Sequence, residues 1–167
     1  VPLSELTEKY GFGLDMISKS ACSVQDPNNY QLDGFGVGLY CQEWNSELES
    51  YLASNQYDLL INSNSTLVYD GELAPAQSYA SAVAGWVEAG QKALLIRDNA
   101  KPNVSDAIND FRFCIEQFGD LAVTECSTPI ADALFPNDTM FDLGSALPGV
   151  ESLDLTALLC ADQVSCP

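Results

Sequence analysis

Histidine is absent from the sequence, and basic residues are scarce. The 167 residues include 24 acidic but only 6 basic side chains, which gives a formal net charge of -18 at pH 7. Without histidine the chain cannot build a Ser-His-Asp triad, and a zinc site has few side chains to use. A phosphate backbone or an anionic membrane surface would repel such an acidic domain. We therefore expect no nucleic-acid partner.

The sequence signatures of several common reactions are also missing. No Gly-x-Ser-x-Gly or Gly-Asp-Ser nucleophile turn, Gly-rich phosphate loop or EF-hand occurs, so the residues of a serine hydrolase, a kinase or a calcium sensor are not found. No apolar run is long enough to span a bilayer, and there is no polybasic anchor or signal peptide. The chain starts at Val1 rather than at a methionine. We therefore expect residues 1–167 to form one soluble domain cut from a larger protein, with no metal and no cofactor.

Six cysteines are present, and their positions, 22/41, 114/126 and 160/166, group them into three pairs that are close in sequence. An even number with this spacing favours three disulfides, Cys22–Cys41, Cys114–Cys126 and Cys160–Cys166, in an oxidising compartment outside the cytoplasm. The alternative is a cytosolic protein with free, buried thiols.

Helical and strand patterns alternate along the chain, which favours an α/β layer fold. The segment 22–41 contains Pro27 and glycines and is expected to be an irregular loop. Ser105 is expected to cap a helix. Helices are predicted at 3–10, 42–54, 74–89, 105–113 and 129–134, and strands at 14–18, 57–62, 92–98 and 149–156.

Two polar segments follow predicted strands, where ligands bind in sheets of this type. In "NSNST" (62–66), the amides of Asn62 and Asn64 can donate hydrogen bonds to a developing oxyanion, although a turn that satisfies its own backbone is the commoner use of such a segment. In "IRDNAKP" (96–102), Arg97 and Asp98 can bind an anionic group or pair with each other.

Several segments form a pattern when they are taken in order: "KSAC" (19–22), "CQEWN" (41–45), "YDLLINSNS" (57–65), "ALLIRDN" (93–99), the cysteines at 114 and 126, and "DLTALLCADQVSCP" (154–167). Together they resemble one family, the extracytoplasmic SGNH domain of membrane acyltransferases of family 3. In that family a cysteine after Lys-Ser-Ala pairs with one just before a Trp-Asn helix, an Arg-Asp follows a core strand, and a Cys-Pro ends an Asp-Leu-Thr segment. The resemblance covers nearly the whole chain, and the ordered cysteines are its most specific part.

The resemblance implies a three-layer α/β/α sandwich with a mainly parallel, SGNH/flavodoxin-like sheet that is stapled by the disulfides. It also implies an outward-facing domain that is tethered to the membrane through its parent protein. Its partners would be the membrane acyltransferase domain of the same parent chain and an acceptor, an envelope glycan or glycolipid that receives an acyl group, expected to be acetyl. The family's oxyanion asparagine would be Asn64 or, as the second choice, Asn62.

Two catalytic blocks of the family have no match here, the Gly-Asp-Ser nucleophile turn and the final Asp-x-x-His segment, so no catalytic serine or histidine is assigned. In SGNH folds the strand that leads into the nucleophile lies inside the sheet. Without it, 14–18 and 57–62 would pair directly in a closed four-stranded sheet, or a groove of unpaired backbone groups and apolar side chains would remain until further segments of the protein complete the sheet.

Two alternatives do not need catalysis by this chain. One is a non-catalytic SGNH-like module that binds a glycan or positions the acceptor through an aromatic-lined cleft. The other is a secreted α/β interaction domain whose cysteine pattern matches the family by chance. Disulfide pairings other than 22–41, 114–126 and 160–166 would favour this alternative.

Overall fold

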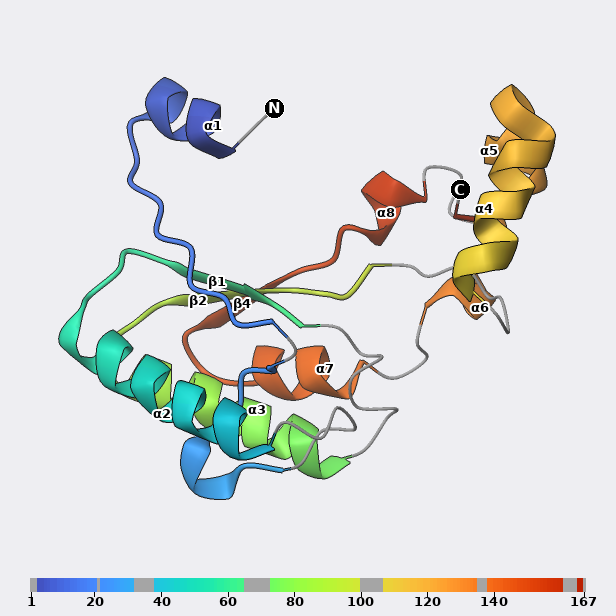
Figure 1. Ribbon diagram of the computed structural model, residues 1–167. Coiled ribbons are helices and arrows are strands. Elements are labelled where there is room, and N and C mark those ends of the chain that lie inside the picture. The colour runs from blue at the N-terminus through green and yellow to red at the C-terminus, as the bar shows by residue number, and fades with distance from the viewer. Residues whose placement is uncertain are drawn as a thin grey trace.

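The computed structural model describes residues 3–20, 22–31, 38–64, 73–99, 107–134, 138–160 and 165–166. These residues combine helices with a three-stranded parallel sheet in the order β1-β2-β4, so the α/β class is confirmed (Figure 1). The sheet strands are β1 (Leu60–Ser63), β2 (Ala93–Ile96) and β4 (Val150–Leu153), and a separate antiparallel pair consists of β3 (Thr128–Pro129) and β5 (Ser165–Cys166). The helices are α1 (Leu3–Tyr10), η1 (Pro27–Asn29), α2 (Gly38–Ser54), α3 (Leu73–Glu88), α4 (Ala107–Phe118), η3 (Gly119–Leu121), α5 (Ala122–Glu125), α6 (Ile130–Ala133), α7 (Thr139–Ser145) and α8 (Thr156–Leu159).

Three of the predicted strands are confirmed, each shorter than expected. Pairing in β1 starts at Leu60, whose N–H donates to the carbonyl of Lys92 (2.8 Å). Before that point Tyr57 donates its N–H to the side chain of Gln91 instead (3.0 Å). The side chain of Gln91 thus takes the place of a neighbouring strand and delays the start of the ladder.

The predicted strand at 14–18 is wrong. These residues pair with no described strand, and Leu14, Met16 and Ile17 are exposed. Tyr57 ties the segment to the start of β1 through a hydrogen bond to Asp15 (2.9 Å). A groove separates the segment from β1. The closed four-stranded sheet, in which 14–18 and 57–62 pair directly, is therefore not formed.

All five predicted helices are found, the last of them as α6, and most have shifted ends. Helix α1 matches its prediction, and α3 ends before Gly90, whose φ of +92° suits glycine. Helix α2 begins earlier, at Gly38, and α4 continues to Phe118, while Ser105 lies outside the described residues. The irregular loop is observed over 22–31. The prediction missed η1, η3, α5, α7, α8 and the β3–β5 pair.

Helices α2, α3 and α7 pack against one face of the sheet (Figure 1). Among the described strands, each later strand is added at the same edge of the sheet, in the order β1-β2-β4. Because right-handed crossovers that all run in one direction place their helices on the same face, the helices share one face of the sheet. On the opposite face, the side chains of Ile61 and Leu153 remain exposed. The core lies between the sheet and these helices and contains Val24, Leu48, Leu52, Ala76, Tyr79, Val83, Trp86, Ala93, Leu95 and Met140.

All three predicted disulfides are present. Cys22–Cys41 ties the irregular loop to α2, with a Cα–Cα distance of 5.2 Å. Cys114–Cys126 joins α4 to the end of α5 (5.8 Å), and Cys160–Cys166 joins the end of α8 to β5 (4.4 Å). These distances suit disulfides. The described residues contain no free cysteine.

Candidate functional site at the carboxyl edge of the sheet

Polar side chains follow all three parallel strands at the same edge of the sheet. The last residues of β1 and β4 both pair with Ile96, the last residue of β2. Because of this register, the residues that come next, Asn64, Arg97 and Asp154, lie at one level beyond the strand ends. The structure therefore places the two polar segments that the sequence indicated at one edge.

The two asparagines at the end of β1 are joined to each other. Asn64 Nδ2 donates a hydrogen bond to Asn62 Oδ1 (3.2 Å), and the hydroxyl of Tyr79 in α3 donates to the same oxygen (2.9 Å). Among the described residues, Asn62 Nδ2 has no hydrogen-bond acceptor. The contacts to Oδ1 hold the Asn62 amide in place and leave its two N–H donors for a ligand. This contact gives Asn62 a geometric reason to act as a donor; whether Asn62 or Asn64 does so stays a prediction.

Arg97 forms an ion pair with Asp154 at the ends of β2 and β4. Its Nη1 atom lies 2.9 Å from Asp154 Oδ2. Partial burial raises the pKa of Asp154, but hydrogen bonds from Thr156 and the charge and hydrogen bond of Arg97 outweigh it, so the pKa is lowered. Arg97 was expected either to bind an anion or to pair with Asp98. The ion pair with Asp154 orients its guanidinium at the edge.

Asp138 connects α7 to the same edge. One carboxylate oxygen accepts the N–H of Phe141 (3.0 Å) and caps α7, and the other accepts the N–H of Asp98 (3.3 Å). Burial raises the pKa of Asp138, which the two backbone hydrogen bonds partly oppose. The position of Asp98 after β2 is thus fixed from α7.

Sequence reasoning missed Tyr79 and Asp138 as parts of this edge. Tyr79 lies in the core, and its hydroxyl reaches Asn62. Asp138 precedes an apolar helical run, and this N-cap signal was present in the sequence. Its contact with Asp98 joins residues 40 positions apart and has no local signal.

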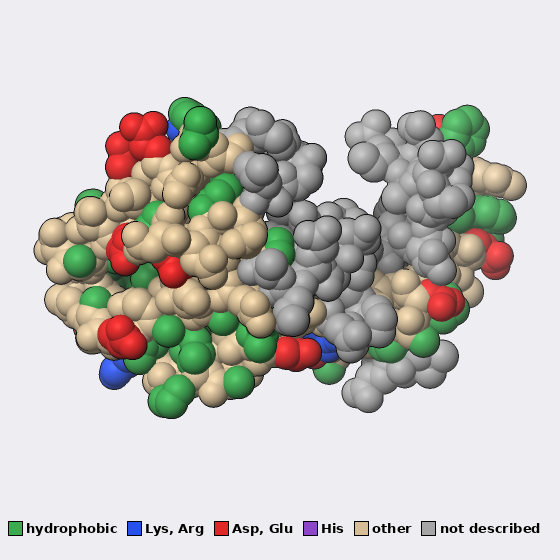
Figure 2. Space-filling model, turned by 90° about the horizontal axis from the view of Figure 1, so that it is seen from below, with side chains coloured by type: hydrophobic (Ala, Val, Ile, Leu, Met, Phe, Trp, Pro, Cys, Tyr) green, Lys and Arg blue, Asp and Glu red, His purple; other side chains and the backbone are tan. Residues whose placement is uncertain are grey.

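Two cavities lie beside the core. The first, called here the helix cleft, has a volume of about 230 Å³ and lies between the loop at 24–28, α2 and α3. The second, called the β1 groove, has a volume of about 180 Å³, lies between residues 13–17 and β1, and extends to Asn62. Acidic side chains recur over the helical face in Figure 2, and basic ones are few.

The edge offers hydrogen-bond donors and carboxylates. Arg97 and the Asn62 amide can stabilise negative charge on an oxygen atom, and Asp138 can hold or release a proton. The described residues contain no group of side chains able to hold a metal ion. Within the described part of the chain, no helix is long and apolar enough to cross a membrane.

Comparisons with family models, curated proteins and solved structures found no match to this chain.

Proposed function

We propose that this chain is the extracytoplasmic, SGNH-like domain of a membrane O-acyltransferase that transfers an acyl group, expected to be acetyl, to a cell-envelope glycan or glycolipid. The observation that carries the proposal is the set of disulfides. Cys22–Cys41, Cys114–Cys126 and Cys160–Cys166 are the pairs that the resemblance implies, and they occur in a parallel α/β fold. Three disulfides are also compatible with an oxidising compartment outside the cytoplasm.

The carboxyl edge supplies this chain's share of the reaction. Acyl transfer through a serine passes through a tetrahedral intermediate whose oxygen carries negative charge. The N–H groups of Asn62, held by Tyr79, would donate to that oxygen, with Asn64 beside them. Arg97, oriented by Asp154, would bind an anionic or hydroxyl group of the acceptor.

The nucleophile and base of this mechanism have no counterpart in the 167 residues. In the proposal, the Gly-Asp-Ser turn and the Asp-x-x-His segment come from other parts of the parent protein. The three-layer sandwich is part of the same proposal. Further strands added at the opposite edge of the sheet would bring helices over the exposed face that carries Ile61 and Leu153, which would form the third layer.

Sequencing the reading frame on both sides of this segment tests the proposal. We expect a run of membrane helices, a Gly-Asp-Ser turn before Val1 and an Asp-x-x-His segment after Pro167. A reading frame with membrane helices but without the two motifs would mean that the domain binds or positions the acceptor and does not catalyse the transfer. A frame with neither the helices nor the motifs would refute the family assignment.

The helix cleft favours a second candidate function, a module that binds a glycan without catalysis. Its lining combines apolar residues such as Leu48 and Trp86 with the polar residues Asn28 and Glu49. Sugars are commonly bound by an apolar surface combined with hydrogen-bonding side chains at its rim. Binding of envelope oligosaccharides that a Glu49→Ala exchange weakens, without hydrolysis of acyl esters, would support this function. No binding to any envelope glycan would refute it.

A further inference from the structure

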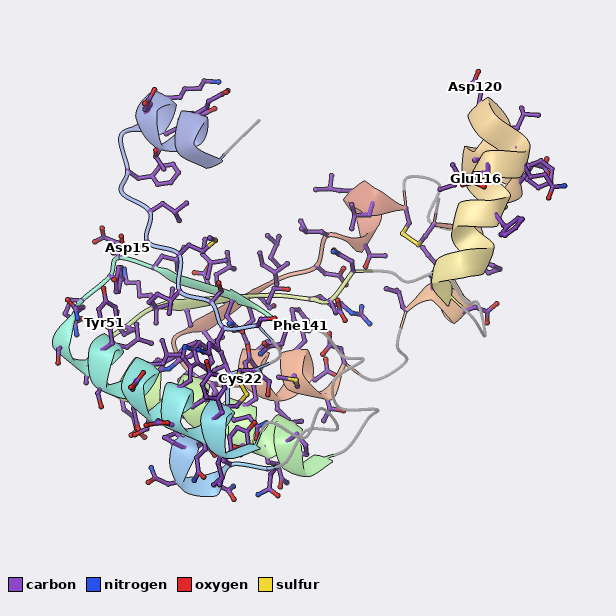
Figure 3. All side chains as sticks on the ribbon, viewed as in Figure 1. Asp15, Cys22, Tyr51, Glu116, Asp120 and Phe141 are labelled. Carbon is purple, nitrogen blue, oxygen red and sulfur yellow. A yellow bond between two sulfur atoms is a disulfide. The ribbon has the colours of Figure 1, made fainter. Side chains whose placement is uncertain are left out.

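The loop that forms one wall of the helix cleft is fixed to both helices beside it. Gln25 donates its N–H to Asn45 Oδ1 in α2 (2.9 Å), and both residues are buried. Asp26 donates its N–H to the carbonyl of Ser78 in α3 (3.0 Å). The Cys22–Cys41 disulfide, labelled at Cys22 in Figure 3, adds a covalent tie to α2. The cleft is therefore formed before any ligand binds, as small-molecule sites usually are.

The helix cleft combines an apolar surface with polar residues around it. Among its other lining residues, Asn28, Glu49 and Ser81 are exposed and can form hydrogen bonds with a ligand. A sugar ring has both kinds of surface, because its C–H groups pack on apolar side chains and its hydroxyl groups bond to polar ones. The apolar lining residues are buried members of the core: Val24, Leu48, Leu52 and Trp86.

Gly85 keeps space open in the helix cleft. It lies inside α3, where glycine is less favourable than alanine. Close packing does not require glycine here, because an added Cβ would meet no atom within 4 Å. Ser81 and Ala89, one turn away on either side, also line the cleft, so a side chain at position 85 would project into it. Glycine at this position thus leaves room for a ligand.

The charge around the helix cleft selects the ligand further. Asp26 and Glu49 line it from the loop and from α2, and its described lining residues include no basic side chain. The ion pairs found within the described part of the chain involve neither carboxylate. Asp26 Oδ1 accepts the N–H of Asn28 (2.8 Å), which holds this carboxylate in place. A protonated amine on the ligand would be attracted here, and an anionic group would be repelled.

We propose that the helix cleft binds one amino-sugar residue of a glycan, with its protonated amine at Asp26 and Glu49 and its ring against Leu48 and Trp86. The cleft volume of about 230 Å³ is below the range of about 300–1,000 Å³ that is typical of sites for drug-sized ligands, which suits a single ring. This binding role rests on the second candidate function, glycan binding, and names its ligand class. It does not require acyl transfer by the chain.

A linear tetramer of glucosamine is the probe, and its fully N-acetylated counterpart has the same length and linkage but no charge. Binding to the 167-residue chain is measured by isothermal titration calorimetry at low ionic strength and at a mildly acidic pH, where the amines carry their protons. We expect the glucosamine tetramer to bind about tenfold more tightly than the acetylated one. Ethanolamine, an amine without a sugar ring, should not displace it at the same concentration.

Two pairs of variants test whether the tetramer binds in the helix cleft. Gly85→Leu should weaken binding about tenfold because it fills the cleft, whereas Gln77→Leu, at a position of α3 outside the cleft, should not. Glu49→Gln should weaken binding about fivefold, whereas Glu47→Gln, which removes the same charge from α2 outside the cleft, should change it little. All four positions are exposed, so the variants should keep the fold.

Equal binding of the two tetramers, lost in Gly85→Leu, would overturn the requirement for an amine but leave the second candidate function standing. Absence of binding of the glucosamine tetramer would overturn the proposal, and the second candidate function would fall with it only if envelope oligosaccharides also fail to bind. Wild-type affinity of Gly85→Leu, or equal losses with Glu47→Gln and Glu49→Gln, would show attraction by overall charge and overturn the proposal. Displacement by ethanolamine would overturn the assignment to a sugar.

Discussion

Replacement of Gly144 by alanine tests how closely α7 lies against the sheet. An added Cβ would overlap Leu95 Cδ1 and lie 3.3 Å from Tyr79 Cε1. Both neighbours are buried, with 1% and 2% of their surface exposed, so neither can move aside into solvent. Overpacking of a filled core costs about 1–3 kcal/mol, and alanine recovers up to about 1 kcal/mol over glycine in a helix. We expect the free energy of unfolding to fall by about 1–2 kcal/mol.

Urea unfolding followed by tryptophan fluorescence measures this change. Gly85→Ala in α3 is the matched control, because a Cβ there meets no atom within 4 Å, and it should stabilise the protein by about 0.5–1 kcal/mol. Leu95→Ala alone should cost about 2–5 kcal/mol. The double variant Gly144→Ala/Leu95→Ala should lose less than the sum of the single variants, because the new methyl group fills part of the cavity. Equal stability of Gly144→Ala and Gly85→Ala would refute the close packing of α7.

Two further predictions concern the edge and the loop. Burial raises the pKa of Asp138 in the folded state above its ordinary value of 3.8. As pH rises from the ordinary pKa to the folded-state pKa, the free energy of unfolding of the wild type should therefore fall relative to that of Asp138→Asn. A difference between the two proteins that does not change with pH in urea titrations would contradict this. Removal of the Cys22–Cys41 disulfide, which spans 19 residues, by Cys22→Ser with Cys41→Ser should cost about 3 kcal/mol in the same assay, and an unchanged urea midpoint would show that the disulfide does not stabilise the fold.

The sequence predicted those elements whose signals are local. The helical pattern predicted both ends of α3 within one residue, and the even number and local spacing of the cysteines predicted all three disulfides. The segment 14–18 failed because a strand needs a partner as well as apolar residues. Its neighbour β1 is separated from it by the β1 groove. No property of five residues contains that information.

The site was predicted in the same uneven way. Strand ends are visible in the sequence, so Asn62, Asn64 and Arg97 were placed at the correct edge. The partners that orient them, Tyr79 and Asp154, are 17 and 57 residues away along the chain. Their contacts arise only when the parallel register is set. Long-range register is therefore the part of this site that the sequence could not supply.

The most direct test of the proposed acyltransferase role is the amount of acyl ester on envelope glycans of cells whose parent gene carries Asn62→Ala, alone or with Asn64→Ala. We expect deletion of the segment that encodes residues 1–167 to abolish the ester, and loss of the oxyanion donors to reduce transfer about 100-fold or more. Asn99→Ala, an exposed change at the same edge, should leave the ester content unchanged. Wild-type ester content after deletion of the segment would contradict the proposed function, and wild-type content with both asparagines replaced would remove them from the reaction.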